Sequence, residues 1–175
     1  MSSSTIFTVG HSTRPLCDFV GLIRSFGVES VIDIRTVPRS RINPQYNLDV
    51  LPESLAQYGI SHYLLSELGG LRKRSKSVPE RTNAFWKNRS FHNYADYALS
   101  ESFDEGLEKL IALGQARPTA IMCAEAVWWR CHRRIVADYL LARGLEVIHI
   151  MGVRAKNKAT LTPAARVFGS KLHYL

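Results

Sequence analysis

Short apolar runs alternate with segments of helical periodicity, and this alternation restricts the fold more than any other feature of the sequence. One helical segment places Leu16, Phe19, Val20 and Ile23 at the i, i+3, i+4, i+7 spacing of a single buried stripe. Strands that alternate with helices form parallel sheets, and right-handed crossovers place helices on both faces. The sequence therefore predicts a three-layer α/β fold with a mostly parallel five-stranded sheet, its strands at residues 6–9, 28–34, 60–65, 119–122 and 145–150.

Local signals predict where several helices begin and end. Pro15 suits a first helical turn, and Gly27 is expected to end that helix. Ser102 and Glu105 have the spacing of a capping box. A helix is expected over residues 48–58, and the last one over 131–143.

The length favours one α/β domain over residues 5–150, followed by a basic tail over 151–175 that is either packed or partly mobile. The first ten residues have no basic start and no long apolar run, so no signal peptide is predicted. Three cysteines provide no disulfide framework and suggest a reducing compartment. We therefore expect a cytoplasmic protein without a membrane partner; the sequence does not indicate its oligomeric state.

The net charge of +8 is concentrated in two segments. Residues 67–92 and residues 151–175 each carry a net +5, so the rest of the chain is slightly acidic. The first segment lies in a connection of more than twenty residues after the third predicted strand, and connections of that length are usually functional or disordered. A nucleotide or nucleic-acid partner is one interpretation, and a solvated surface is the other.

Polar side chains follow every predicted strand at its carboxyl end. Parallel α/β sheets bind ligands beyond this edge, so the pattern predicts a polar site there. The residues concerned are His11 and Ser12, Asp33 and Arg35, Glu67, Cys123 and Glu125 with Arg130 to His132, and His149.

Six short motifs also occur in order: VGHS at 9–12, DIR at 33–35 followed by Pro38, NPQYN at 43–47, ELGG at 67–70, CAE at 123–125 and CHR at 131–133. Together they resemble the prokaryotic family called domain of unknown function 488, over about residues 5–150. The resemblance implies a compact α/β domain with a shared polar site built from these residues. It brings no activity with it, so the chemistry must be argued from the residues.

Cys123 and Arg130 flank a predicted strand-to-helix turn, as in cysteine phosphatases and rhodanese-like sulfurtransferases. A helix N-terminus attracts anions and lowers the pKa of a thiol. Six residues separate this pair where the phosphatase signature has five, and Val127, Trp128 and Trp129 are bulky. Cys123 is alternatively a small apolar residue of the core.

Cys131 and His132 are neighbours at the expected start of the last helix, where adjacent side chains point in different directions. We therefore do not expect them to pair with each other. A Cys123–Cys131 redox pair is one alternative. A metal site that combines these three residues with His11 is another, but no familiar ligand spacing supports it, and no cofactor is predicted.

The leading hypothesis is an enzyme, a hydrolase or transferase, that acts on a phosphate-bearing substrate such as a nucleotide or nucleic acid. Arginine binds phosphate in bidentate fashion, and carboxylates with histidine can move protons. The alternatives are a non-catalytic nucleic-acid-binding module and a thiol- or metal-dependent redox or sulfur-transfer protein. Asp33 is alternatively a partner of an arginine in a buried ion pair. The expected catalytic residues are His11, Asp33, Glu67, Cys123, Glu125 and Cys131, and the expected substrate-binding residues are Ser12, Arg35, Arg41, Tyr46, Arg130, His132 and Arg133.

Overall fold

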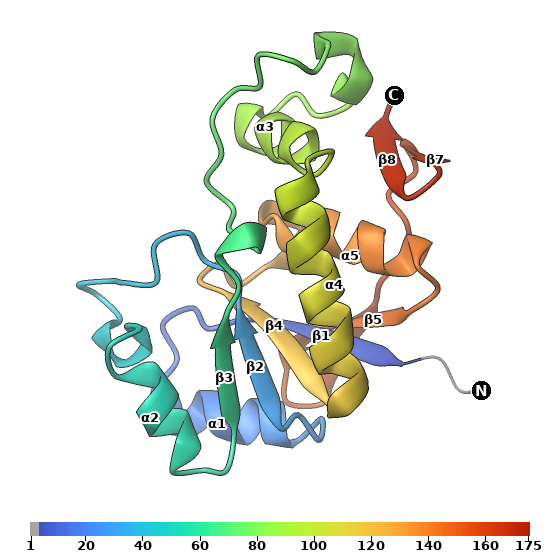
Figure 1. The fold of residues 1–175 in the computed structure, drawn as a ribbon. Coiled ribbons are helices and arrows are strands. Elements are labelled where there is room, and N and C mark those ends of the chain that lie inside the picture. The colour runs from blue at the N-terminus through green and yellow to red at the C-terminus, as the bar shows by residue number, and fades with distance from the viewer. Residues whose placement is uncertain (1–3) are drawn as a thin grey trace.

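The central sheet has six strands in the order β3-β2-β4-β1-β5-β6 (Figure 1). This is a computed structural model, and it describes residues 4–175. The first five strands are parallel, and β6 runs antiparallel to β5 at the edge. The strands are β1 Thr5–Gly10, β2 Ser30–Asp33, β3 Ser61–Leu64, β4 Thr119–Cys123, β5 Glu146–Gly152 and β6 Ala155–Lys158.

Helices cover both faces of this sheet, which confirms the predicted three-layer α/β architecture (Figure 1). Helices α1 (Leu16–Arg24) and α2 (Leu51–Ala56) bury their apolar side chains in one cluster. Helices α3 (Arg89–Tyr97), α4 (Glu101–Ala116) and α5 (Arg133–Ala142) pack in a second cluster. β4 and β1, at the centre, are therefore covered on both sides, as their apolar sequences require.

Two helix starts differ from the sequence expectation. Helix α4 is capped by Ser100, whose hydroxyl accepts a hydrogen bond from the backbone N–H of Phe103 at 3.3 Å, so the predicted Ser102 cap is wrong. Helix α5 begins at Arg133, two residues later than expected. The reason is a short 3-10 turn at Trp128–Arg130, after which Cys131 is extended with φ −132° and ψ 151°.

The basic tail is packed and contributes three strands. Beyond β6 it forms a hairpin of β7 (Ala165–Phe168) and β8 (Lys171–Tyr174). Tyr174 is fully buried, and its hydroxyl donates to the Asp138 carboxylate on α5 at 2.8 Å. The backbone N–H of Thr162 donates to the other oxygen of this carboxylate at 2.9 Å. Two hydrogen bonds to one buried carboxylate thus hold the tail against the domain.

Tyr174→Phe is expected to lower the free energy of unfolding by about 1–3 kcal/mol, because one oxygen of buried Asp138 loses its hydrogen-bond donor. Urea denaturation measures this loss. Leu175→Ala is the matched control, since Leu175 is 61% exposed and its truncation should change stability by no more than about 0.5 kcal/mol. Equal stability of the two variants would show that the Asp138 contact contributes little.

The long segment between β3 and α3 contains two short 3-10 turns, Ser66–Leu68 and Glu80–Asn83. It rises above the end of α3 in Figure 1. Between residues 4 and 175, none of the helices combines the length and the apolar character needed to cross a membrane.

Candidate functional site

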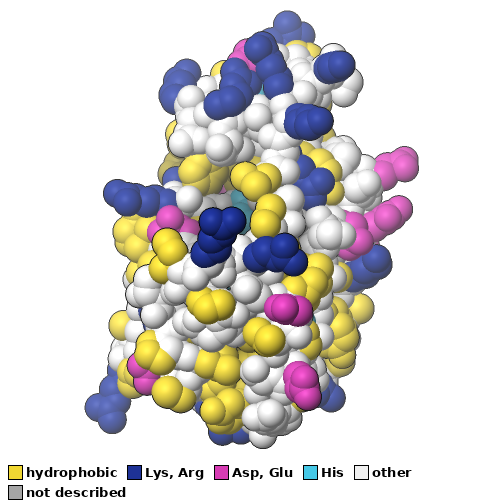
Figure 2. All heavy atoms as spheres, turned by 90° about the vertical axis from the view of Figure 1, so that its left-hand side faces the viewer, with side chains coloured by type: hydrophobic (Ala, Val, Ile, Leu, Met, Phe, Trp, Pro, Cys, Tyr) yellow, Lys and Arg dark blue, Asp and Glu magenta, His cyan; other side chains and the backbone are white. Residues whose placement is uncertain are grey.

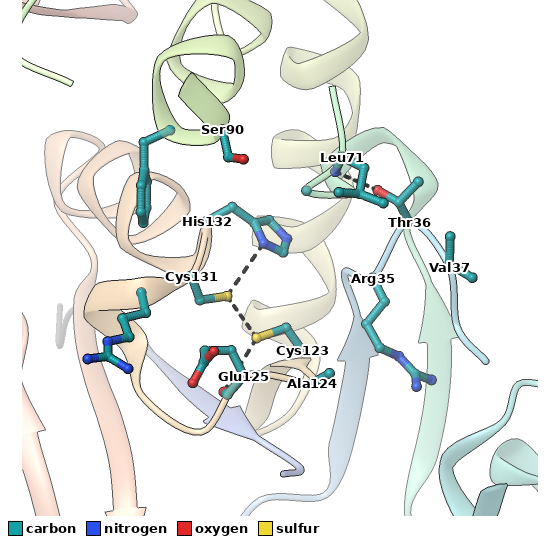
Figure 3. A pocket seen from close by; sticks show the side chains of 13 residues that line it. Arg35, Thr36, Val37, Leu71, Ser90, Cys123, Ala124, Glu125, Cys131 and His132 are labelled. Atoms are coloured by element: carbon teal, nitrogen blue, oxygen red, sulfur yellow. Dashed lines mark hydrogen bonds between the residues drawn. The ribbon is translucent and has the colours of Figure 1, made fainter. Parts of the chain in front are cut away.

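A cavity of about 310 Å³ opens where β2 and β4 end (Figure 3). Its walls are mostly apolar and come from five separate parts of the chain, with Val37 after β2, Leu71 after β3, Phe91 on α3, Ala124 after β4 and His132 before α5. The carboxyl ends of parallel strands thus supply the site, as the sequence pattern predicts. The reactive groups that line the cavity are Cys123, Cys131 and His132.

The two cysteine sulfur atoms lie 2.8 Å apart. Cys123 is the last residue of β4, and Cys131 lies just before α5. The loop over 124–130 therefore brings the chain back beside the end of β4. Their side chains are largely enclosed, with residue exposures of 3% and 6%, yet both line the cavity (Figure 3). Because a disulfide bond is about 2.05 Å long, closing one here requires an approach of less than about 1 Å.

The surroundings make the two thiols unequal. Burial opposes ionisation of Cys131, but the Cys123 thiol, the His132 ring and the Arg133 guanidinium outweigh burial and hold the pKa of Cys131 well below its ordinary value. Burial raises the pKa of the Cys123 thiol well above its ordinary value, and the contact with Cys131 raises it further. Cys131 is therefore the more readily ionised of the two thiols, and Cys123 is the one that holds its proton more strongly.

His132 contacts the reactive sulfur directly. Its Nδ1 lies 3.5 Å from Cys131 Sγ, and its Nε2 donates to the carbonyl oxygen of Ile34 at 2.7 Å. The expectation that Cys131 and His132 do not pair is wrong, because Cys131 is extended and lies outside the helix. Gly70 makes room for the ring, since a Cβ there would lie 2.5 Å from His132 Nδ1.

Arg133 lies behind the thiols and is only 1% exposed. Its guanidinium donates to the carbonyl oxygen of Glu125 at 2.6 Å and to Thr8 Oγ1 at 3.3 Å, while its backbone N–H donates to Cys131 Sγ at 3.4 Å. The guanidinium Nε is buried with no hydrogen-bond partner among residues 4–175. The expectation that Arg133 binds substrate is not met by this position, because the side chain does not line the cavity.

Arg133 also lacks an acidic partner. Within the described part of the chain, no carboxylate oxygen lies within 4.0 Å of its guanidinium. A buried charge requires compensation, and the ionisable groups beside it that can become negative are the Cys123 and Cys131 thiols, both of which raise the pKa of Arg133 against the effect of burial. The fold thus favours the ionised form of Cys131.

Behind Arg133, a buried histidine is held in the neutral form. His149 Nδ1 lies 2.6 Å from Thr8 Oγ1, and the ring stacks on Trp128 at 4.4 Å between centroids. Burial lowers the pKa of His149 to about 4, and Arg133 lowers it as well. Thr8 and His149 face each other across β1 and β5, two strands whose neighbouring residues are mostly apolar. The sequence analysis does not identify this pair, although two polar positions within otherwise apolar strands are a signal that could have done so.

A second cavity of about 250 Å³ adjoins the first, and Arg35, Val37, Ala124 and Glu125 line both. Arg35 is held by an ion pair with buried Asp33, with 2.6 Å between Nη2 and Oδ2, which is the structural alternative considered for that carboxylate. On the far side of Arg35, the second cavity is lined by His11, Ser12 and Arg39.

In the second cavity, the His11 ring is oriented so that its Nε2 can accept a hydrogen bond. Its Nδ1 donates to the carbonyl oxygen of Ser12 at 2.8 Å, so Nε2 is left to accept from Arg35 Nη1 at 3.4 Å. Its ring stacks on Tyr46 with 4.1 Å between centroids. Burial lowers the pKa of His11 to about 4, and Arg35 adds to this effect. His11 is therefore neutral near pH 7, and its Nε2 is suited to accept a hydrogen bond.

The family comparison covers most of the chain. A model of the family described as Domain of unknown function DUF488 matches residues 15–140. The chain belongs to the DUF488 family. The match includes Asp33, Arg35, both site cysteines and Arg133, whereas His11 and His149 lie outside it. No curated protein and no solved structure matches the chain.

Several expected residues lie away from the cavity that is lined by Cys123 and Cys131, here called the thiol cavity. Glu67 sits in the 3-10 turn after β3 and points to Lys109 on α4, with 3.5 Å between the charged atoms. Arg41 lines neither of the two cavities, and the Tyr46 hydroxyl donates to the carbonyl oxygen of Arg14 at 2.7 Å. Glu125 and Arg130 do line the thiol cavity, both as exposed residues.

Two other sequence hypotheses find little geometric support in the DUF488 domain. The backbone N–H groups of Arg130 and Cys131 donate to Val127 and Trp128, so they do not point into an anion cradle like that of a cysteine phosphatase. Across residues 4–175, no three His, Cys, Asp or Glu side chains are grouped as metal ligands.

Proposed function

We propose that this DUF488 protein is a thiol-dependent oxidoreductase that alternates between a Cys123–Cys131 dithiol and the corresponding disulfide. The observation that carries the proposal is the 2.8 Å separation of the two sulfur atoms in the wall of a cavity. The opposite pKa shifts of the two thiols support a division of roles. Cys131 is the nucleophile and Cys123 is the resolving thiol.

In the proposed cycle, the Cys131 thiolate attacks atom X of an X–Y bond, such as that of a disulfide or a peroxide. Y leaves as an anion and takes up a proton from water. The Cys123 sulfur then attacks the Cys131 sulfur, and X leaves with the proton of Cys123. The substrate gains two electrons and two protons, the protein is left with a disulfide, and an external thiol reductant restores the dithiol.

Neighbouring groups support each step of this cycle. Arg133 and the N-terminus of α5 stabilise the attacking thiolate, because the Arg133 amide points to Cys131 Sγ. His132 Nδ1, which also faces this sulfur, can accept its proton in the dithiol state. The apolar walls at Val37, Leu71 and Phe91 limit water around the reacting atoms.

Titration with dipyridyl disulfide in a Cys17→Ser background tests the proposal, since it leaves Cys123 and Cys131 as the sole cysteines. The dithiol protein should release two equivalents of pyridinethione rapidly and end as an intramolecular disulfide. Cys123→Ser should release one equivalent and remain as a mixed disulfide. Cys131→Ser should react at least about tenfold more slowly at pH 7, because the remaining thiol keeps its proton.

The two single variants are controls for each other, as each removes one sulfur from the same pair. Equal reaction rates for Cys131→Ser and Cys123→Ser would contradict the assigned roles. Two equivalents without any intramolecular disulfide by mass spectrometry would contradict the cycle.

We propose a phosphate-bearing substrate as a second feature of the function, as the basic composition first suggested. Arg130 lines the thiol cavity and Arg39 lines the adjoining one. Neither has an acidic side chain within 4.0 Å in the described residues. Free guanidinium groups at the edge of the site favour an anionic group on the substrate.

A further inference from the structure

Residues 72–89, here called the basic arch, form a surface beside the thiol cavity. The proposed thiol chemistry gives this surface no role. The arch contains seven Arg and Lys residues and one acidic residue, Glu80. Figure 1 places it at the top of the molecule, and Figure 2 shows Lys and Arg side chains gathered at that end of the face. Such a concentration of like charge attracts phosphate-rich partners.

Most of this charge is not neutralised within the arch. Glu80 pairs with Arg89 at 2.6 Å and with Arg74 at 3.5 Å. The remaining exposed cations have no acidic side chain within 4.0 Å in the described part of the chain; they are Lys73, Lys76, Arg81 and Lys87.

Specific contacts hold the arch in place although it has little regular structure. The Arg72 guanidinium lies 3.7 Å from the centre of the Tyr97 ring and donates to the carbonyl oxygen of Ser66 at 2.7 Å. Fully buried Asn83 donates to Asp96 at 2.7 Å and accepts from the Tyr174 amide at 3.1 Å. The free cations are therefore presented by an ordered scaffold, which lowers the entropy cost of binding a partner.

The thiol cavity adjoins both ends of the arch. The residues just before it, Gly70 and Leu71, and those just after it, Ser90 and Phe91, all line that cavity. Leu71 is also 69% exposed, which is unusual for a large apolar residue at the edge of a site. If a chain of phosphates is bound along the arch, the groups attached to those phosphates therefore lie at the cavity entrance.

We propose that the basic arch binds a nucleic-acid strand and places one nucleobase in the cavity that contains Cys123 and Cys131. Single-stranded nucleic acids are bound by cations along the backbone together with flat or apolar surfaces for the bases. The cavity is at the small end of ligand sites and matches one ring system rather than an extended ligand. This inference rests on the proposed function in taking this cavity as the reacting site.

Fluorescence anisotropy with a labelled single-stranded RNA and a DNA of the same sequence, each about 15 nucleotides long, tests the binding surface. A strand that contacts four phosphates should lose roughly 50-fold in affinity between about 50 and 200 mM salt. Lys76→Glu with Lys87→Glu should weaken binding by at least about tenfold at low salt, because two attractive charges become repulsive.

Arg154→Glu with Lys156→Glu is the matched control. It reverses two charges that are also exposed and that lie near Ser25 and Phe26 at the end of α1, away from the arch. This variant should bind within about twofold of the wild type if the arch carries the contact. Equal losses in the two double variants, or heparin that competes as strongly as the oligonucleotide at equal charge, would overturn the proposal.

Placement of the base is tested by photocrosslinking with oligonucleotides that carry iodouracil. We expect crosslinks at Leu71, Phe91 or His132, and their loss in Lys76→Glu with Lys87→Glu. Crosslinks confined to the C-terminal residues would overturn the proposal even if binding is tight. Since crosslinking does not require a reactive thiol, nucleic-acid binding and the thiol chemistry can fail separately.

Discussion

Arg133→Met is expected to slow alkylation of Cys131 at pH 7 by about 10- to 100-fold. Hydrogen bonds and contacts to a charged group are worth about 1.5–3 kcal/mol, and each 1.36 kcal/mol is about tenfold in rate. Methionine keeps the volume of the buried side chain but removes the positive charge beside both sulfurs. The pKa of Cys131 should rise as a result, and iodoacetamide kinetics across pH, in a Cys17→Ser background, would record the change.

Arg134→Met is the matched control for this prediction. Arg134 is the next residue, but its guanidinium packs over the Trp86 ring at 5.0 Å and does not contact the thiols. Its loss should leave the pH profile of alkylation unchanged. Arg133→Lys should restore part of the reactivity, since it returns a positive charge to the same place. An Arg133→Met protein that is folded and has the wild-type pH profile would show that Cys131 is ionised by its other neighbours.

The layered fold could be predicted from the sequence, and so could the position of a polar site at the carboxyl ends of the strands. Both follow from apolar periodicity and chain direction. Asp33 and Cys123 end neighbouring strands, so their approach follows from parallel pairing. The same reasoning fails for Glu67. It lies beyond edge strand β3, in a turn that packs under α4, where a Cβ on Gly106 would lie 2.7 Å from the Glu67 side chain. Helix packing, which periodicity does not specify, turns this carboxylate away from the site.

The centre of the site depends on two features that residue patterns describe poorly. The contact between Cys131 and His132 requires an extended residue before α5, and its cause is a 3-10 turn of bulky residues. The role of Arg133 requires an arginine that is fully buried without a carboxylate. Arginine is almost always placed at the surface by composition rules, so its burial could be found only from the packed structure.

The sixth strand was missed for a different reason. Residues 155–158 have the sequence AKNK, with no apolar alternation, and all four are exposed. They pair with β5 as an antiparallel edge, where lysine is favoured because it discourages further strand pairing. An edge strand of this kind is defined by its neighbour rather than by its own sequence.

Asp33→Asn is expected to lower the free energy of unfolding at pH 7 by about 3–5 kcal/mol, the usual cost of removing one partner of a buried ion pair. Asp33 is fully buried and accepts three hydrogen bonds from Arg35, at 3.1 Å from its backbone N–H and at 2.8 and 2.6 Å from its guanidinium. An amide in this position accepts fewer of them and leaves the Arg35 charge uncompensated. Urea denaturation of both proteins measures the difference.

The effect should also depend on pH in a defined direction. Burial opposes ionisation of Asp33, but the hydrogen bonds from Arg35, with a further contribution from His62, hold the pKa of the folded carboxyl below its ordinary value. A lowered pKa in the folded state means that this stabilisation is complete above the unfolded pKa of about 4 and is lost as pH falls through the folded value. The gap between wild type and Asp33→Asn should therefore be constant from pH 7 to about pH 5 and should shrink below about pH 4. Asp49→Asn, at an exposed position, should change stability by no more than about 0.5 kcal/mol at any of these pH values. A gap that stays constant down to pH 3 would mean that Asp33 stabilises the fold through its shape and packing, and that its charge is not what positions Arg35 between the two cavities.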